Sequence, residues 1–385
     1  MVGIGGYARG YLLALEKQST GQLAAIVDPM AESALAWPCI QEQKTPVFDS
    51  IKAFLDSGIQ IDLAVISSPI SFHAEQSCAL LEVGINVLCE KPIAATVAEA
   101  NRMRAARDAS GKFLEIGYQW CFSQAIQALK IDIMKGDLGK AETLRTRVEW
   151  PRSSSYYARN SWAGCIRNEQ GRVVNDSPVG NATAHYLFNM LYLLGKEPHL
   201  AARPKRITAE CYRANPIQNY DTACCHIETE EGTEIYFYTT HAVKEPDGPV
   251  FKYQFEKAEV RYESGGEIIA YLKDGTVRNY GDPNSNSMLK LEFCIQKCLA
   301  PNNSPSICSA EAASMHTACV EALQKTPIKT IPENQFERIR DPKDNALLIY
   351  IPGLDQAIKE AFDRKLQFSD LSLPWTMPAP MTIDM

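Results

Sequence analysis

The stretch that decides the fold is Ile85-Asn86-Val87-Leu88-Cys89-Glu90-Lys91-Pro92. Its apolar first half is typical of a buried parallel strand. Pro92 ends the strand pairing and fixes the backbone directly after Lys91. Because ligands of an open α/β sheet bind at the carboxyl ends of its strands, we expect the amine of Lys91 to project into a ligand crevice.

A glycine-rich turn near the start of the chain, Gly3-Ile4-Gly5-Gly6-Tyr7-Ala8, has the spacing G-x-G-x-x-A. Small residues there let the main chain approach a pyrophosphate, and the following helix offers N–H donors at its N-terminus. Asp28 ends the apolar run 23–28 and is placed to accept hydrogen bonds from an adenosine ribose. Since its carboxylate would repel a 2′-phosphate, NAD is favoured over NADP.

Other residues at strand ends are expected to line the same crevice. Ser67 and Pro69 end the apolar run at 63–67, and His73 opens the next helix in a supporting role. The residues that we predict to bind the cofactor are Gly3, Gly5, Gly6, Tyr7, Ala8, Asp28, Ser67, Pro69, His73, Glu90 and Lys91. An ordinary tight turn before a helix is the alternative explanation for each of these short motifs.

The first third of the chain alternates between apolar strands and helices, which indicates right-handed crossovers and a parallel sheet. Strands are expected at 63–67, 86–89 and 113–117, and helices at 74–83 and 98–109. Only Met1-Val2 precede the glycine turn, so we expect the rest of the first strand to lie upstream of this numbering.

The pattern changes after residue 120. Residues 206–280 alternate by twos, which predicts an antiparallel sheet with one exposed face. Helices are expected at 125–134, 288–299, 310–323 and 345–364, and a long polar loop at 151–180. The predicted fold is therefore α/β, with an N-terminal Rossmann domain (1–119, a doubly wound parallel sheet) and a C-terminal α+β domain (120–385, a large open, mostly antiparallel sheet).

Composition narrows the function classes. The 385 residues are 45% hydrophobic and 22% charged, with a net charge of −7. This charge argues against nucleic acid as a partner. The chain has no apolar run of the roughly 20 residues that a membrane span requires, so we expect a cytoplasmic protein without a membrane partner. No His, Asp and Glu cluster has ligand spacing, so no metal is expected.

A second group of polar residues lies at Asn181-Ala182-Thr183-Ala184-His185, before an apolar helix that ends near Gly195. Asn181 and His185 are four residues apart and therefore share a helix face. A lone histidine on such a helix is more often a core residue, but one that follows a long polar loop and shares a face with an amide indicates a site. Histidine is the natural acid–base group near neutral pH.

The segment from Tyr156 to Gly164 has the composition of a sugar-binding loop. Its aromatic residues, with Trp162 among them, could pack on the apolar face of a sugar, while Arg159 and Asn160 could bind hydroxyls. A packed surface loop anchored by Trp162 is an equally good explanation.

Taken together, the glycine turn, Asp28, Ser67-Ser68-Pro69 with His73, Cys89-Glu90-Lys91-Pro92 and His185 resemble the Gfo/Idh/MocA oxidoreductases. The family is named for glucose-fructose oxidoreductase and inositol dehydrogenase. The resemblance covers most of the chain, and Glu90-Lys91-Pro92 is its most specific part.

The resemblance implies roles for individual residues. Lys91 corresponds to the catalytic lysine of the family, and His185 to the histidine of its D-x-G-x-H motif. Asn181 stands where that motif has aspartate, and an amide cannot act as the carboxylate that tunes a lysine or histidine. Asp176 is the candidate substitute. Tyr118 and Gln119 lie where family members contact the nicotinamide or the substrate.

The resulting hypothesis is an NAD-dependent enzyme that transfers hydride between a sugar or cyclitol hydroxyl and nicotinamide. The substrate would lie between the two domains, and the open sheet of the second would form a homo-oligomer, a dimer or tetramer. Two alternatives remain at this point. One is an NAD-dependent glycosidase acting by transient sugar oxidation and elimination, and the other is a non-catalytic NAD-binding regulator, suggested by Asn181.

Overall fold

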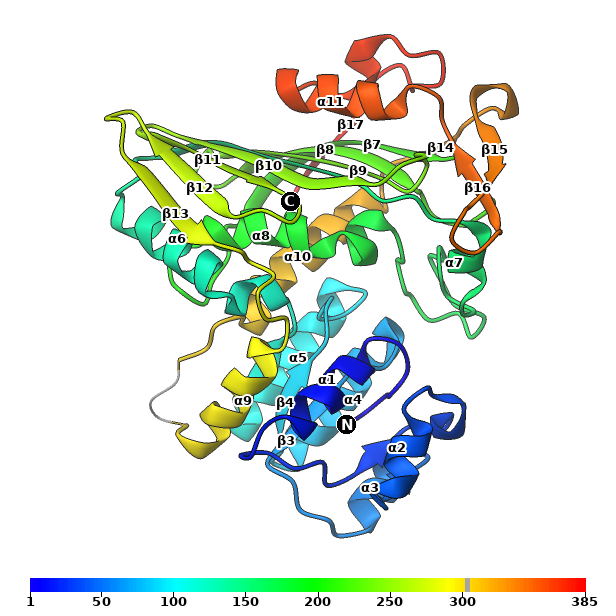
Figure 1. Ribbon diagram of the computed structural model, residues 1–385, viewed down its shortest axis with the longest axis vertical. Helices are drawn as coiled ribbons and strands as arrows, with labels where there is room; N and C mark the ends of the chain where they lie inside the picture. The colour runs from blue at the N-terminus through cyan, green and yellow to red at the C-terminus, as the bar shows by residue number, and fades with distance from the viewer. Residues whose placement is uncertain (302–304) are drawn as a thin grey trace. The chain divides into compact units, whose positions relative to one another are not determined.

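A computed structural model describes residues 1–301 and 305–385, and the chain divides into two compact units. The first unit comprises Met1–Ser123 and Asn284–Ser314, and the second comprises Gln124–Pro283 and Met315–Met385. Figure 1 shows both units, with labels on many of their elements. The predicted division into 1–119 and 120–385 is therefore corrected. Helix α9 (Leu289–Leu299) belongs to the first unit because its apolar face packs on strands of that unit.

The first unit is built on a parallel sheet. Strands β3 (Leu63–Ile66), β4 (Asn86–Cys89) and β5 (Leu114–Ile116) pair in this order, and β1 (Ile26–Val27) pairs with β2 (Val47–Phe48). Val2 joins the two sets, since it forms parallel bridges to both Val27 and Ile66. The resulting order, with Val2 at the centre, is that of the predicted Rossmann sheet.

Helices surround this sheet and close its core. They are α1 (Ala8–Glu16), α2 (Trp37–Glu42), α3 (Ile51–Asp56), α4 (His73–Glu82), α5 (Val97–Ser110) and α9. Tyr11 of α1 and Leu291 of α9 pack with Val65 and Leu88 of the sheet. α5 begins with a capping box in which the side chains of Thr96 and Glu99 bond each other's backbone N–H groups, as a stable helix start requires.

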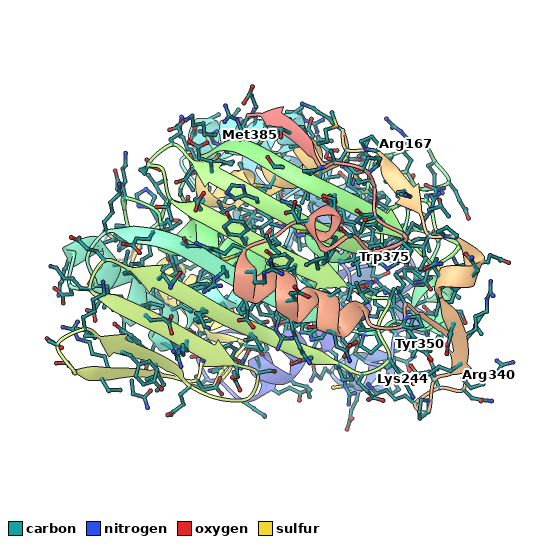
Figure 2. All side chains as sticks on the ribbon, turned by 90° about the horizontal axis from the view of Figure 1, so that it is seen from above. Arg167, Lys244, Arg340, Tyr350, Trp375 and Met385 are labelled. Carbon is teal, nitrogen blue, oxygen red and sulfur yellow. The ribbon has the colours of Figure 1, made fainter. Side chains whose placement is uncertain are left out.

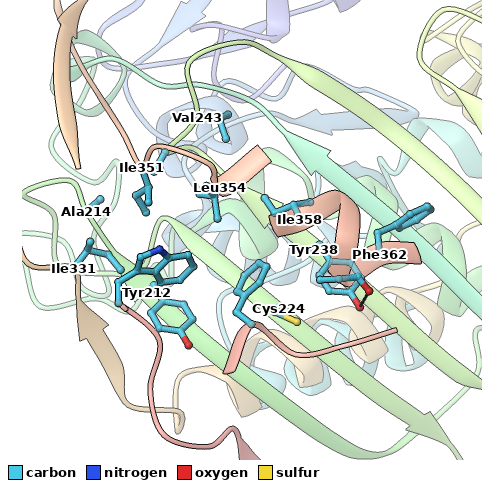
Figure 3. Packing of buried hydrophobic residues seen from close by; sticks show 14 of the residues in the cluster. Tyr212, Ala214, Cys224, Tyr238, Val243, Ile331, Ile351, Leu354, Ile358 and Phe362 are labelled. Carbon is cyan, nitrogen blue, oxygen red and sulfur yellow. Dashed lines mark hydrogen bonds between the residues drawn. The ribbon is translucent and has the colours of Figure 1, made fainter. Parts of the chain in front are cut away.

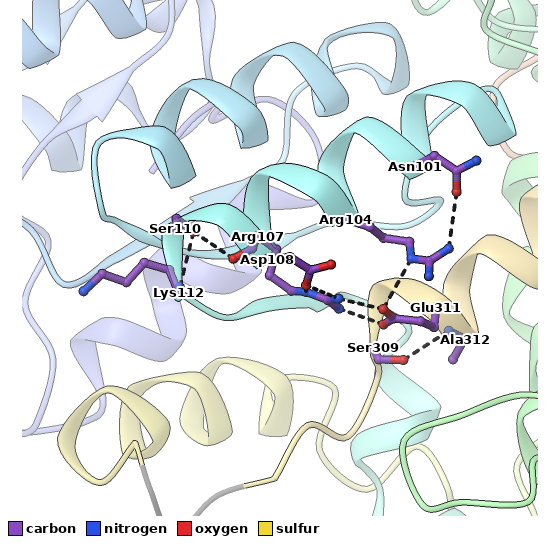
Figure 4. Close-up of polar contacts among 9 residues, drawn as sticks. All are labelled: Asn101, Arg104, Arg107, Asp108, Ser110, Lys112, Ser309, Glu311 and Ala312. Carbon is purple, nitrogen blue, oxygen red and sulfur yellow. Dashed lines mark hydrogen bonds and ion pairs between the residues drawn. The ribbon is translucent and has the colours of Figure 1, made fainter.

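A half-buried ion cluster ties α5 to the segment that follows α9. Arg104 and Arg107 of α5 both contact Glu311, and Arg107 donates to both of its carboxylate oxygens, at 2.6 and 2.7 Å (Figure 4). Burial opposes ionisation of Glu311, but the hydrogen bonds from Arg107 outweigh it and lower the pKa of Glu311 to about 2.

The second unit is built on a ten-stranded sheet. Its main order is β13-β12-β11-β10-β6-β9-β8-β7-β14, and β17 pairs with β7. Neighbours are antiparallel except for two parallel pairs, β6 with β9 and β7 with β14. The strands are β6 (Ala141–Glu149), β7 (Pro204–Arg213), β8 (Thr222–Thr229), β9 (Glu234–Thr240), β10 (Asp247–Phe255), β11 (Ala258–Glu263), β12 (Ile268–Leu272), β13 (Val277–Gly281), β14 (Ile328–Thr330) and β17 (Met381–Asp384). The predicted large, mostly antiparallel sheet is confirmed.

Helices cover both faces of this sheet. Figure 1 shows α6 (Gln124–Lys135), α8 (Ala184–Leu193) and α10 (Ala310–Leu323) on one side and α11 (Leu354–Arg364) on the other. From above, α11 lies across the middle strands (Figure 2). Its inward residues, including Ile358 and Phe362, pack on Tyr212 and Tyr238 of the strands (Figure 3).

One predicted helix is wrong in its N-terminal part. The sequence predicts a helix over 345–364, but Leu347–Tyr350 form β16, which pairs with β15 (Glu337–Arg340) in a hairpin. Pro352 and Gly353 separate this strand from α11. Gly353 has φ +77°, a conformation that a continuous helix does not allow.

Across the described ranges 1–301 and 305–385, the longest and most apolar helices are still too short or too polar to cross a membrane.

Candidate active site

The glycine turn has the geometry of a nucleotide cradle. Gly3 has φ +76°, and a Cβ there would lie 2.8 Å from the Cα of Ser68, so only glycine fits. At Gly5 and Gly6 a Cβ would meet no described atom within 4 Å, which leaves the backbone open to a ligand. α1 begins directly after the turn and directs its first N–H groups toward this opening.

Asp28 lies beside the turn, as the sequence predicts. It follows β1, and its two carboxylate oxygens accept hydrogen bonds of 2.8 Å from the backbone N–H groups of Ile4 and Met30. Each oxygen keeps a second lone pair for a ribose hydroxyl. These residues therefore fit the adenosine half of a dinucleotide.

His73 connects two strand ends. Its ring is 1% exposed, and its nitrogens lie 2.8 Å from the carbonyl oxygen of Pro92 and 2.9 Å from that of Ser68. Burial lowers the pKa of His73, although both carbonyl acceptors act in the opposite direction. Both ring nitrogens lie within hydrogen-bond distance of backbone carbonyls, so His73 connects the loops after β3 and β4.

Glu90 is the centre of a buried charge network. Its Oε1 accepts hydrogen bonds from Nζ of Lys290 and, at 2.5 Å, from the hydroxyl of Tyr11. Its Oε2 accepts the backbone N–H of Lys91 at 3.2 Å. Burial alone would raise the pKa of Glu90, but the charge of Lys290 and these hydrogen bonds lower it. The sequence predicts that Glu90 binds the cofactor; in the structure its carboxylate pairs with the buried Lys290 and Tyr11.

Lys290 comes from α9, 200 residues away in the chain, and its side chain is fully buried. Its Nζ also donates to the carbonyl oxygen of Gly117 at 3.1 Å and lies 4.5 and 5.1 Å from the ring centres of Tyr7 and Tyr11. The network joins α1, α9 and the ends of β4 and β5 around the backbone of Lys91. The Lys91 side chain itself is half-buried.

Tyr118 and Gln119, the two residues after β5 that we predict to contact the nicotinamide or the substrate, differ in exposure. Gln119 is half-buried, and its Oε1 accepts a 2.8 Å hydrogen bond from the hydroxyl of Tyr7, which is 45% exposed. Tyr118 is only 1% exposed. The accessible polar side chain here is therefore Gln119, whereas the side chain of Tyr118 is enclosed; the expectation that both contact the nicotinamide or the substrate stays a prediction.

In the second unit, Asp176 lies in direct contact with Asn181. The Asn181 amide donates to Oδ1 of Asp176 at 2.7 Å, and the backbone N–H of Gly164 donates to Oδ2 at 2.6 Å. Asp176 is 2% exposed. The carboxylate that the sequence lacks at 181 is thus present beside the amide, as predicted for Asp176.

The backbone around this pair is irregular. Pro178–Ala182 form a π-helical turn, and α8 begins only at Ala184, so Asn181 and His185 do not lie on one continuous α-helix as expected. Such π-turns occur often at functional sites. The His185 ring is half-buried, with its centre 6.4 Å from that of Tyr186.

The predicted sugar platform is arranged differently from the expectation. The guanidinium carbon of Arg159 lies 3.5 Å from the ring centre of Tyr156 and 5.6 Å from that of Trp162. Arg159 also donates to the carbonyl oxygen of Tyr156 at 3.1 Å. The Tyr156 ring therefore supports a guanidinium, instead of leaving both faces free for a sugar.

Sequence reasoning missed two residues of the network around Glu90, Tyr11 and Lys290. The only signal for Lys290 was a charged residue among the apolar positions of a helix. Lys91 lies in the first unit and His185 in the second, so each unit contributes its own group of candidate residues.

Comparison with known proteins shows what the chain is similar to. Residues 1–118 match the family model GFO_IDH_MocA, described as an oxidoreductase family with an NAD-binding Rossmann fold. The chain is 27% identical over 198 residues to the rhizopine catabolism protein MocA of Rhizobium meliloti. It is 22% identical over 194 residues to the glucose-6-phosphate 3-dehydrogenase of Bacillus subtilis. These matches cover 51% and 50% of this chain and 57% and 52% of the relatives, so the chain spans about half the length of the relatives.

Solved structures share the fold over a longer stretch. The WlbA dehydrogenase of Bordetella pertussis, in complex with NADH and UDP-GlcNAcA, superposes with a TM-score of 0.69 at 20% identity. The match covers 84% of this chain and 94% of that one. The UDP-N-acetylglucosamine 3-dehydrogenase GnnA of Acidithiobacillus ferrooxidans gives a TM-score of 0.66 at 19% identity, with coverages of 84% and 94%.

Proposed function

We propose that this chain is a Gfo/Idh/MocA oxidoreductase, the family whose model matches residues 1–118, and that it transfers a hydride between a sugar or cyclitol hydroxyl and NAD. The names of its relatives support this substrate class. Besides those above, they include a D-glucoside 3-dehydrogenase of Escherichia coli, 33% identical over 102 residues (26% of this chain and 29% of that protein).

The observation that carries the proposal is the position of the glycine turn relative to Lys91 within one parallel sheet. The turn follows Val2, and Lys91 follows β4, with only β3 between them. At the usual strand spacing of just under 5 Å, the two strand ends are about 10 Å apart. A dinucleotide whose pyrophosphate contacts the turn can therefore extend toward Lys91.

NAD would supply the hydride acceptor or donor. We assign the pyrophosphate to the glycine turn and the start of α1, and the ribose to Asp28. The carboxylate of Asp28 disfavours the 2′-phosphate of NADP by charge repulsion.

Two side chains are assigned to the proton of the substrate hydroxyl. These side chains are Lys91 and His185. His185 or Lys91 removes the hydroxyl proton, and the ammonium of Lys91 stabilises the developing oxyanion. Asp176 supplies the negative charge that the family motif places at position 181, and Asn181 binds a hydroxyl.

Replacing Lys91 tests the proposal. Lys91→Met should lower turnover on a reactive polyol by about 10²- to 10⁴-fold, the usual contribution of a positioned proton-transfer group. NADH formation is followed by absorbance, and NAD affinity by calorimetry, which should change little. Lys52→Met, at a lysine that is 83% exposed in the same unit, is the matched control. Unchanged turnover in Lys91→Met would exclude Lys91 from the mechanism.

The same assay separates the proposal from the two alternatives. Stoichiometric accumulation of NADH with an oxidised sugar is expected. Release of an aglycone without net NADH would indicate the glycosidase, and NAD binding without turnover on a polyol panel would indicate the regulator.

A further inference from the structure

The loop after β6 contains a positively charged cluster that the hydride transfer itself does not need. The side chains of Arg152 and Arg159 both contact the ring of Tyr156, with guanidinium carbons 4.7 and 3.5 Å from its centre. Both arginines and this tyrosine belong to the second unit.

Neither the Arg152 nor the Arg159 guanidinium forms an ion pair with a carboxylate in the part of the chain that the structure describes. Among the same residues, Nε of Arg152 is buried without a hydrogen-bond partner. The nearby carboxylates are already engaged: Asp176 accepts from Gly164 and Asn181, and Asp221 accepts three N–H bonds of 2.7 to 3.0 Å from residues 214 and 215. Two unpaired cations on one ring repel each other unless an anion joins them.

A buried histidine completes the cluster. His241 is 2% exposed, its Nδ1 lies 3.2 Å from the hydroxyl of Tyr157, and its ring meets the ring of Tyr156 edge-on at 5.5 Å. Its Nε2 is buried without a hydrogen-bond partner among the described residues. Burial and the charges of the two arginines keep the pKa of His241 well below its ordinary value, so the imidazole is neutral and adds no repulsion.

The cluster is continuous with the proposed reaction site of the same unit. Arg152 lies 5.7 Å from the ring of Trp150, which packs edge-on against Tyr186, the residue after His185. Asp176 holds the far end of the loop through the N–H of Gly164. We place the reacting carbon of the substrate at His185 and one of its substituents at the arginines.

We infer that Arg152 and Arg159 form a subsite for an oxyanion, a carboxylate or phosphate, carried by the sugar substrate. The guanidinium group matches both anions because its N–H donors form a planar fork that binds two oxygens at once. The Tyr156 ring preorganises both arginines by cation–π contact, which lowers the conformational entropy lost on binding. This inference deepens the proposed function and rests on it for the position of the reacting carbon.

Direct binding tests the inference without turnover. We would titrate the full chain, with NAD present, with D-glucose, D-glucuronate and D-glucose 6-phosphate by calorimetry. At least one anion should bind about ten- to 100-fold more tightly than glucose, and the pair of anions distinguishes a carboxylate from a phosphate subsite. Arg159→Gln should lose this preference about tenfold or more, and Arg159→Lys should lose only part of it because the charge remains without the fork.

Arg167→Gln is the matched control, because Arg167 is an exposed arginine of the same long loop that donates to the carbonyl oxygen of Gly171. Arg167 is labelled in Figure 2. The inference would be overturned if all three sugars bound equally well, or if none of them bound detectably. It would also be overturned if Arg159→Gln and Arg167→Gln had equal effects. Anion preference in binding, together with no NADH formation from any member of the polyol panel, would instead contradict the proposed function and leave the subsite standing.

Discussion

Lys290→Met should destabilise the first unit strongly, because it leaves the buried Glu90 carboxylate without its cation. Lys290 is 0% exposed and Glu90 9% exposed at the side chain, so water cannot replace the lost partner. Removing one partner of a buried ion pair typically costs about 3–5 kcal/mol. Met is close to Lys in length, so packing is largely conserved.

The magnitude can be bounded from the titration of Glu90. Burial is already the largest influence on its pKa, and without Lys290 that pKa rises above the ordinary value of 4.5. Once the carboxyl is protonated in the folded state, the penalty at pH 7 is set by ionisation of the unfolded chain. Each pH unit above 4.5 lowers the free energy of unfolding by about 1.4 kcal/mol, so the loss at pH 7 is about 3 kcal/mol.

The penalty also has a definite sign with pH. A carboxyl whose folded pKa is raised favours the folded state below the unfolded pKa and loses that contribution as pH rises. The difference between wild type and Lys290→Met should therefore be about 3 kcal/mol at pH 7 and shrink toward pH 4.5. Urea unfolding followed by circular dichroism at several pH values measures it.

Lys297→Met is the matched control on the same helix. Lys297 lies two turns after Lys290 and forms a 2.7 Å ion pair with the buried Glu115. Both variants should lose stability. Only Lys290→Met disturbs the Glu90 carboxylate, which accepts the backbone N–H of Lys91, so Lys290→Met should lower kcat more than Lys297→Met. Adding Glu90→Gln to Lys290→Met should recover stability. A loss below about 1 kcal/mol at pH 7, or one that does not change with pH, would refute the reasoning.

Three further perturbations act on other parts of the protein. Gly3→Ala should weaken NAD binding by about tenfold or more and should lower the Tm more than Gly58→Ala does. Both glycines have positive φ, but only at Gly3 would the added Cβ lie within 3 Å of other backbone atoms. Calorimetry measures NAD binding and thermal scans measure the Tm of the two variants, and equal effects would contradict the clash. The pKa of Glu311 is lowered from its ordinary 4.5 to about 2. The ionised Glu311 carboxylate therefore stabilises the fold above pH 4.5, and this stabilisation is lost as the pH falls toward 2. In Arg107→Gln, the free energy of unfolding measured by urea titration should fall much less between pH 4.5 and pH 2 than in the wild type. The same pH dependence in both proteins would argue against a stabilising ion pair between Arg107 and Glu311. Asp176→Asn should lower kcat by about tenfold or more if its charge assists proton transfer and should alter the pH–rate profile; a kcat and profile matching wild type would leave Asp176 a purely structural role.

Local patterns predicted most of the elements. The strand at 86–89 and the helix at 310–323 match the structure closely, because each has a clear period or clear end signals. The hairpin strand β16 was missed, since a short apolar run beside a helix has no period of its own. The glycine turn and Asp28 were also found from sequence, because turn chemistry and spacing along one crossover are local properties.

What the sequence by itself determined is therefore most of the helices and strands, the parallel sheet of the first unit and the candidates Lys91, His185 and Asp28. Tertiary structure alone decided which charges meet. Lys290 pairs with Glu90 across 200 positions, α9 joins the first unit, and Arg152 meets His241 beside Tyr156. The physical reason is that periodicity shows which face of an element is buried, whereas the partner of that face depends on long-range packing that no local pattern encodes.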